Sequence, residues 1–146
     1  THCISSAASD VYKRQVGRVG AVFQEDRLCP QLNAVQNVEL VLPEGKGQYK
    51  EQIETDFLRF GLDRAALALP ARKLSGGQKR RAALLRALWA ESDTLLLDEP
   101  FTGMDPATMK KAAALLKERC GEKVVLLATH DRGAIEELGW QVIALG

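Results

Sequence analysis

The stretch that most constrains the fold of this chain is Leu74–Pro100, LSGGQKRRAALLRALWAESDTLLLDEP. Its Ser-Gly-Gly turn precedes a helical pattern, and its final apolar run ends in Asp98 and Glu99. Glycines let a backbone approach a ligand closely, and the N–H groups at a helix start attract anions. Carboxylates at the end of a parallel strand can reach Mg²⁺ and a water molecule. The stretch therefore indicates nucleotide chemistry.

Apolar runs and turn residues predict an alternation of strands and helices along the chain. Strands are expected at 17–24, 94–97, 123–129 and 140–145, and helices at 33–42, 48–60, 63–69, 74–91, 105–119 and 133–138. From residue 94 onward the strands and helices alternate, which implies parallel βαβ units. The apolar run 94–97 is expected to be a fully buried strand. The prediction is an α/β fold, a parallel sheet with a helical subdomain at about 31–90.

Individual residues predict where several helices begin and end. Asn33, Asp63, Ser75 and Asp105 can each cap a helix N-terminus, because their side chains accept hydrogen bonds from free N–H groups. Gly61 suits the position just after the helix 48–60. The basic helix residues Lys79, Arg80, Arg81 and Arg86 are expected to form a solvated face, and added attraction for nucleotide phosphates is the alternative.

Length and composition restrict the class of protein. The 146 residues suit one domain, and residues 1–15, THCISSAASDVYKRQ, are expected to be a disordered or foreign tail ahead of a domain at 16–146. A net charge of +1 gives no electrostatic case for nucleic-acid binding. Three cysteines without a CxxC pair argue against a disulfide framework or a zinc site. The sequence contains no run of 18 apolar residues, so it predicts no membrane span.

Two further polar residues follow predicted strands. Gln24 ends the strand 17–24, and His130 follows the strand 123–129. Each residue alone is more often structural or solvated than functional, and the Ser-Gly-Gly turn alone is consistent with a capped helix after a glycine hinge. The order is more specific: Gln24, then LSGGQ, TLLLDEP, Met104-Asp105 and THD. Over about residues 16–146 this order resembles the ATP-binding cassette ATPase family, a P-loop NTPase-like fold.

The resemblance implies roles for four residues toward the nucleotide of their own subunit. Gln24 matches the Q-loop glutamine, which contacts the metal and senses a transmembrane partner. Asp98 matches the Walker B aspartate that helps to hold Mg²⁺. Glu99 matches the catalytic glutamate that polarises the attacking water, and His130 matches the switch histidine that contacts the γ-phosphate of ATP.

The resemblance also implies residues that face a second subunit. Ser75, Gly76, Gly77 and Gln78 match the signature motif, which caps the γ-phosphate of ATP held by the opposite subunit. Asp105 matches the D-loop aspartate at the dimer seam. A head-to-tail dimer of ATPase subunits is therefore expected, with ATP and Mg²⁺ as cofactors.

The implied function is that of an energy-coupling ATPase subunit of a membrane importer, for a small anionic or organic solute. Transmembrane permease subunits would be its partners, and it would lie in the cytoplasm, peripheral on the inner face of the membrane. No nucleic-acid partner is expected. The text VFQEDRLCPQLNAVQNV around Gln24 looks closest to the nitrate/sulfonate/taurine importer group.

One departure from the family pattern is decisive for this chain. The Walker A phosphate cradle, GxxxxGK[ST], is absent: the single Gly-Lys pair, Gly45-Lys46, is followed by Gly47, and Leu40 stands where the first glycine should be. Only 23 residues precede Gln24. We therefore expect an N-terminally truncated cassette that lacks the family's first strands and that is inactive alone, although the intact parent would be an ATPase.

Two alternatives stay open. The first is a soluble, non-transport cassette protein of the repair or ribosome-associated kind, although the 49 residues between Gln24 and Leu74 are too few for the long coiled coil of repair members. The second is a degenerate, non-catalytic partner module. A module of that kind would have no chemical need for Glu99.

Overall fold

A computed structural model of the chain describes residues 17–43 and 47–143. The predicted tail at 1–15 lies outside the described residues, so its boundary stays a prediction. Gly45 and Lys46 also lie outside the described residues.

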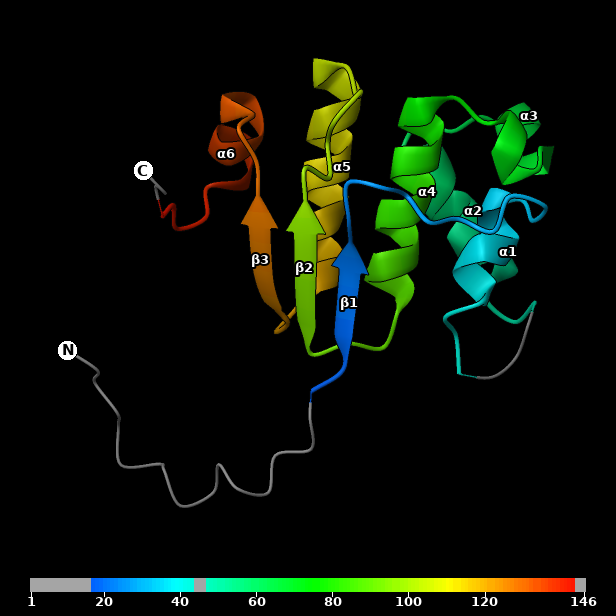
Figure 1. Cartoon of the computed structure of the whole chain (residues 1–146), viewed down its shortest axis with the longest axis horizontal. Helices are drawn as coiled ribbons and strands as arrows, with labels where there is room; N and C mark the ends of the chain where they lie inside the picture. The colour runs from blue at the N-terminus through cyan, green and yellow to red at the C-terminus, as the bar shows by residue number, and fades with distance from the viewer. Residues whose placement is uncertain (1–16, 44–46, 144–146) are drawn as a thin grey trace.

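The described part is built on a three-stranded parallel sheet (Figure 1). Its strands are β1 Val19–Val22, β2 Thr94–Asp98 and β3 Val124–Ala128, in the spatial order β1-β2-β3. Val22 lies opposite Leu97, and Asp98 lies opposite Ala128. The carboxyl ends of all three strands therefore reach one edge of the sheet, and the predicted parallel α/β architecture is confirmed.

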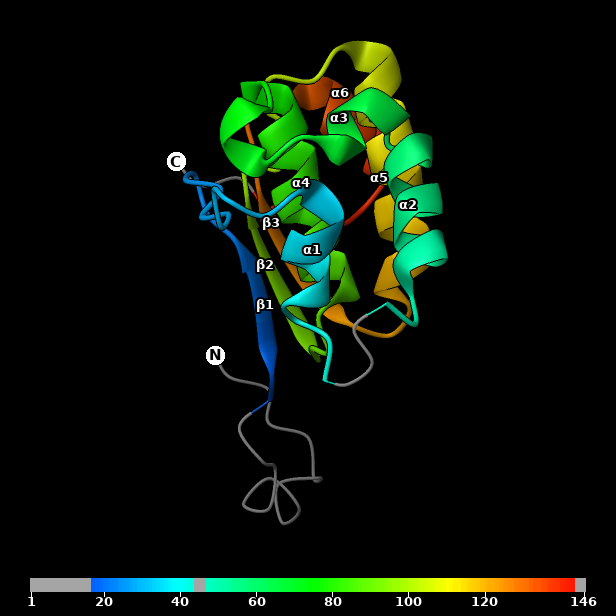
Figure 2. The ribbon, with the colours of Figure 1, turned by 90° about the vertical axis from the view of Figure 1, so that its right-hand side faces the viewer.

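The helices lie on one face of this sheet (Figure 2). They include α4 Gly76–Trp89, α5 Pro106–Cys120 and α6 Arg132–Leu138. Leu95 and Leu97 point into the core and are almost fully buried, whereas Leu96 is 38% exposed and Leu126 is 60% exposed. The prediction of a strand buried on both faces was wrong for this reason: among the described residues, no helix covers the second face.

The predicted helical subdomain at about 31–90 would end with α4, and its bounds stay a prediction. The part of the chain between β1 and α4 is the helical region. It consists of α1 Ala34–Glu39, α2 Lys50–Arg59, α3 Arg64–Ala68 and a 3₁₀ turn, Ala71–Lys73. Asn33 and Asp63 cap their helices as predicted, and Gly61 has φ +78 just after α2. Local side-chain chemistry therefore sets these boundaries.

The strand predicted at 140–145 was wrong for its described part. Residues 140–143 form no strand, and 144–145 lie outside the described residues. A strand needs a neighbouring backbone to pair with, and β propensity alone does not supply one. Val142 and Ile143 are 60% and 78% exposed, so neither contributes to the core.

A buried carboxylate connects the helical region to the rest of the molecule. Asp56 of α2 is 2% exposed. Its Oδ2 accepts hydrogen bonds from Trp89 Nε1 at 3.0 Å and from Arg119 Nη2 at 2.5 Å. The Arg119 guanidinium also lies 4.8 Å from the Trp89 ring centroid. Helices α2, α4 and α5 thus meet at one polar contact.

We predict that Asp56→Ala lowers the free energy of unfolding by about 3 kcal/mol, because it leaves a cation and an indole N–H without their buried partner. Glu118→Ala is the matched control, since it removes the exposed ion pair with Arg59 on the same pair of helices and should change stability little. Urea unfolding monitored by circular dichroism measures both. Equal losses in the two variants would contradict the prediction.

Candidate functional site

The predicted site residues gather at one edge of the molecule. The carboxyl ends of β1, β2 and β3 and the N-terminal ends of α4 and α5 all lie at the top of Figure 1. Gln24 follows β1, Glu99 follows β2 and His130 follows β3. The parallel register places them there, since Asp98 pairs with Ala128, two residues before His130.

Glu99 is the most closely held of these residues. Its φ of +46 is unusual for a residue with a side chain, and its N–H donates to the carbonyl of Ala128 at 2.9 Å. The carboxylate accepts hydrogen bonds from Thr129 Oγ1 and from the His130 N–H, both at 3.0 Å. His130 Nδ1 lies 2.7 Å from Glu99 Oε1. The structure therefore brings Glu99 and His130 into direct contact.

These contacts set the charge of the carboxylate. Burial alone would raise the pKa of Glu99, but hydrogen bonds from the His130 ring, the Thr129 hydroxyl and the His130 backbone outweigh it, so the pKa lies below its ordinary value. Glu99 is therefore ionised at neutral pH. Thr129 was missed at the sequence level, and its position immediately before His130 was the available signal.

Asp98 differs from its neighbour. It is exposed at the end of β2, and no described residue donates a hydrogen bond to its carboxylate oxygens, although its backbone carbonyl is engaged. A carboxylate without protein donors is suited to a cation. In the described part of the chain, no cluster of three or more His, Cys, Asp or Glu side chains is placed to hold a metal ion.

The signature turn, Ser75–Gln78, forms a reciprocal cap on α4. Ser75 Oγ accepts from the Gln78 N–H at 3.2 Å, and Gln78 Oε1 accepts from the Ser75 N–H at 2.9 Å. The N–H groups of Gly76 and Gly77 have no partner within the helix, because they precede its first hydrogen bonds. The turn therefore presents two backbone donors, while the Gln78 amide oxygen is used in the cap.

The two glycines differ in what surrounds them. A Cβ on Gly76 would have no atom within 4 Å, whereas a Cβ on Gly77 would lie 2.8 Å from the carbonyl oxygen of Gly103. Gly77 thus allows the loop after β2 to pack against the signature turn, and Gly76 leaves an open approach to the backbone.

Asp105 occupies the start of α5. Its Oδ1 accepts from the Ala107 and Thr108 N–H groups at 3.0 Å, and its Oδ2 accepts from Thr108 Oγ1 at 2.5 Å. The Thr108 hydroxyl and N–H are the main reasons that the pKa of Asp105 lies below its ordinary value. Pro106 at the first helical position completes the predicted cap.

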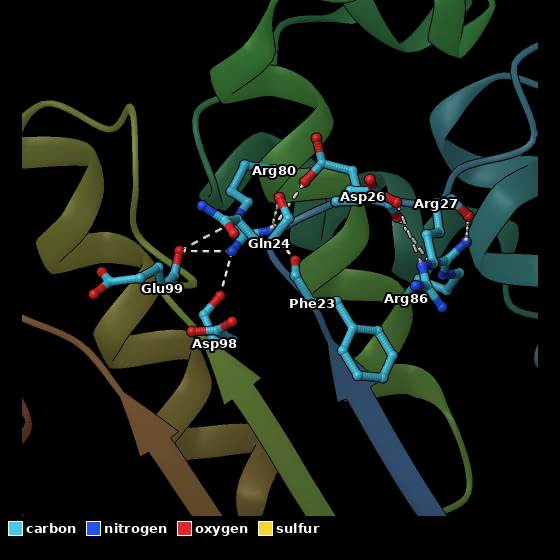
Figure 3. Close-up of polar contacts among 9 residues, drawn as sticks. Phe23, Gln24, Asp26, Arg27, Arg80, Arg86, Asp98 and Glu99 are labelled. Carbon is cyan, nitrogen blue, oxygen red and sulfur yellow. Dashed lines mark hydrogen bonds and ion pairs between the residues drawn. The ribbon is translucent and has the colours of Figure 1, made fainter.

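The basic residues of α4 were predicted wrongly as a solvated face. Arg80 is 4% exposed and lies between the ends of β1 and β2 (Figure 3). Arg81 donates to the carbonyls of Gly77, Phe60 and Gly61, and Arg86 donates to those of Asp26 and Arg27. These arginines donate to backbone carbonyls, most of which belong to other segments of the chain. The spacing of residues along a helix does not predict such contacts.

Comparison with known proteins agrees with this geometry. Residues 4–102 match the family model described as ABC transporter. The chain belongs to the ABC transporter family. The matched range begins inside the segment 1–15, and the boundary of the ATP-binding cassette at residue 16 therefore stays a prediction.

Similar proteins are ATP-binding subunits of importers. The chain is 38% identical over 135 residues to the aliphatic sulfonates import ATP-binding protein SsuB 1 of Xanthomonas axonopodis pv. citri, and the match covers 88% of this chain and 53% of that protein. It is 40% identical over 115 residues to the thiamine import ATP-binding protein ThiQ of Photobacterium profundum, with 75% and 47% covered. The predicted similarity to sulfonate importers is confirmed. The chain spans about half the length of these relatives.

Among solved structures, the chain resembles the ATP-binding cassette MJ0796 in a dimeric, post-hydrolysis state bound to ADP and Pi. The TM-score is 0.68 at 29% identity, covering 82% of this chain and 55% of that one. The cassette fold is therefore confirmed. Within residues 17–43 and 47–143, no helix combines the length and hydrophobicity needed to cross a membrane.

We predict that Gly77→Ala lowers the free energy of unfolding by about 1–3 kcal/mol, because the new methyl group would overlap the Gly103 carbonyl. Gly76→Ala is the matched control at the adjacent position, and its stability should be unchanged or slightly raised because its Cβ meets open space. Thermal unfolding of both variants measures the difference. A Gly77→Ala variant as stable as Gly76→Ala would contradict the packing argument.

We predict that Glu99 contributes to the loss of stability in acid. Because its pKa is lower in the folded chain than the value of about 4.3 expected when unfolded, its ionised form stabilises the fold above that value. The contribution disappears as the pH falls through the folded pKa. Glu99→Gln should therefore weaken the dependence of unfolding free energy on pH below about 4.3. Urea unfolding at a series of pH values tests this, and an unchanged slope would contradict it.

Proposed function

We propose that this chain contributes the catalytic carboxylate and the signature turn of an ATP-hydrolysing, energy-coupling importer subunit. The observation that carries the proposal is the cluster of Glu99, Thr129 and His130 at the carboxyl ends of β2 and β3, beside the exposed carboxylate of Asp98. In open parallel sheets, ligands bind outside the carboxyl ends of the strands. Names of the similar proteins support the same class of function.

Glu99 is suited to orient a water molecule for attack on a phosphate. It is ionised at neutral pH, and its contacts with Thr129 and His130 hold the carboxylate in one orientation. An ionised, oriented carboxylate can accept the proton of an attacking water. His130 is exposed, so its ring is accessible to a phosphate oxygen from the same edge.

Asp98 and Gln24 would hold Mg²⁺, since Mg²⁺ is bound in proteins by one or two carboxylates together with substrate phosphates. The free carboxylate oxygens of Asp98 fit this role. When bound, the ion supplies positive charge that neutralises phosphate oxygens. Preorganised charges of this kind account for much of the catalysis of phosphoryl transfer.

The signature turn would act on a nucleotide held by a second ATPase subunit in a head-to-tail dimer. The free N–H groups of Gly76 and Gly77 and the start of the α4 dipole favour an anion there. Asp105 would lie at the dimer seam. This arrangement makes each nucleotide site a product of two chains.

Permease subunits would bind the helical region. A surface hollow of about 360 Å³ opens there between α1, α2 and α3, and its lining includes Glu39, Lys50, Glu54 and Arg64. Charged groups of both signs suit contact with a polar loop of a partner. The chain would then act in the cytoplasm on the inner face of the membrane, and a small anionic or organic solute is the proposed cargo.

The 146 residues alone should bind ATP weakly, because they contain no GxxxxGK[ST] sequence to cradle the phosphates. A soluble, non-transport cassette protein and a non-catalytic partner module are the competing functions. The ionised, hydrogen-bonded Glu99 favours catalysis over the second of these.

A chimera tests the proposal, in which residues 17–146 replace the matching part of the Xanthomonas SsuB 1 protein. We predict ATP hydrolysis that falls by about 100-fold or more in Glu99→Gln, since general base catalysis contributes at least this much. Glu118→Gln, on the exposed side of α5, is the control and should leave the rate unchanged. Uptake of an aliphatic sulfonate by cells lacking their own SsuB tests transport.

An inactive chimera that folds and binds ATP would contradict the catalytic proposal. An active chimera that fails to restore uptake would favour a non-transport function. The chain of 146 residues, assayed in parallel, should show no ATP hydrolysis. If it hydrolyses ATP and Glu99→Gln abolishes that activity, the chain is active alone and the prediction is wrong.

A further inference from the structure

Arg80 is a buried cation whose hydrogen bonds join the ends of two strands. Its Nε and Nη2 donate to the carbonyl oxygen of Glu99 at 3.0 and 2.8 Å, and Nη2 also donates to the carbonyl of Asp98. Nη1 donates to the carbonyls of Phe23 and, at 3.4 Å, Gln24. Figure 3 shows the guanidinium between these two groups of carbonyls.

Among the described residues, the charge of Arg80 has one carboxylate partner, Asp26. Nη1 lies 3.2 Å from Asp26 Oδ1, and the two side chains are 5% and 23% exposed. A buried guanidinium is costly unless its donors are satisfied. Here the fork is directed at backbone carbonyls on both sides, so the site is built for arginine and not for a basic residue in general.

The contacts on the β2 side act on the conformation of Glu99. The peptide carbonyls on both sides of the Glu99 Cα are held by one rigid, planar group. A φ of +46 costs free energy for a residue with a side chain and persists only where its surroundings fix it. The same backbone conformation directs the carboxylate toward Thr129 and His130.

We propose that Arg80 is a positioning residue, which holds Glu99 in its left-handed conformation and connects it to the Gln24 loop and to the helix of the signature turn. Because Arg80 and the signature turn belong to one helix, α4, movement of that turn against a partner would be transmitted to Glu99. The catalytic meaning of the inference rests on the proposed function, whereas the positioning itself does not.

Lysine should not replace Arg80. A guanidinium has five N–H donors in a fixed plane, whereas an ammonium is a single point with three rotatable donors. Lysine could keep the ion pair with Asp26, but it could not span the carbonyls of Phe23 and Glu99 at once. Arg80→Lys therefore keeps the positive charge but removes the planar set of donors, so it distinguishes the effect of the charge from that of the hydrogen-bond geometry.

The experiment uses the 146-residue chain with Arg80→Gln and Arg80→Lys, compared with Arg86→Gln on the same helix. Arg86 also donates to loop carbonyls, but it makes no hydrogen bond to the end of β2. In both Arg80 variants, amide hydrogen exchange at Glu99 and His130 should accelerate by about tenfold, as expected for the loss of a hydrogen bond. Exchange at Leu84 and Leu115 in the core should keep the wild-type rate.

A second measurement records the NMR chemical shift of the His130 N–H proton, which reports its hydrogen bond to Glu99 Oε1. In the Arg80 variants this signal should move upfield, because the Glu99 carboxylate no longer meets the His130 N–H. Arg86→Gln should leave it unchanged. A His130 N–H shift and exchange rates that match those of Arg86→Gln would overturn the proposal, whatever the loss of overall stability.

If neither Arg80 variant folds, a measurement on the wild-type chain tests the proposal. Rotation about the Arg80 guanidinium bonds, observed through its nitrogen resonances, should be slower than that of the exposed Arg72 and Arg132. Free rotation of the Arg80 guanidinium would overturn the proposal. In the SsuB 1 chimera, Arg80→Gln should lower kcat with little change in the KM for ATP. An inactive chimera would contradict the proposed function alone, because the NMR measurements need no activity.

Discussion

The parallel pairing of β1, β2 and β3 is the constraint on which the rest of the structure depends. In a parallel ladder, every strand leaves the sheet on the same side, and each crossover returns its helix so that the next strand can begin at the opposite edge. Residues far apart in sequence, Gln24, Glu99 and His130, therefore reach one edge. The helices that follow or flank these strands begin at that edge too, which adds their free N–H groups to it.

The polar contacts at this edge provide hydrogen-bond partners for backbone carbonyls that are buried where the strands end. Where strands end, backbone carbonyls lose their ladder partners, and a buried carbonyl without a partner is costly. Water would normally satisfy these groups. At the ends of β1 and β2 the Arg80 guanidinium does so instead, and it brings a positive charge close to Glu99. One side chain thus satisfies backbone carbonyls at two strand ends and, under the proposed function, would also position the catalytic carboxylate of Glu99.

Much of the fold follows from local chemistry that the sequence displays. Asn33, Asp63, Ser75 and Asp105 cap helices because each side chain can reach N–H groups two or three residues ahead. The misjudged features depend on distant partners. Arg80 looked solvated because its acceptors come from strands 18 or more residues away, and the segment at 140–143 looked like a strand although no described backbone pairs with it. The contact of Thr129 with Glu99 likewise depends on register, which periodicity does not fix.

The signature turn illustrates how capping and ligand binding can share one set of atoms. Ser75 Oγ accepts a hydrogen bond from the Gln78 N–H, so its own hydroxyl hydrogen stays available to donate. The Gln78 amide oxygen is used by the Ser75 N–H. A phosphate arriving at this turn would therefore meet the Ser75 hydroxyl and the N–H groups of Gly76 and Gly77, and the cap would remain intact. Under the proposed function, Gln78 would hold the turn in shape for the nucleotide, and its side chain need not touch the phosphate.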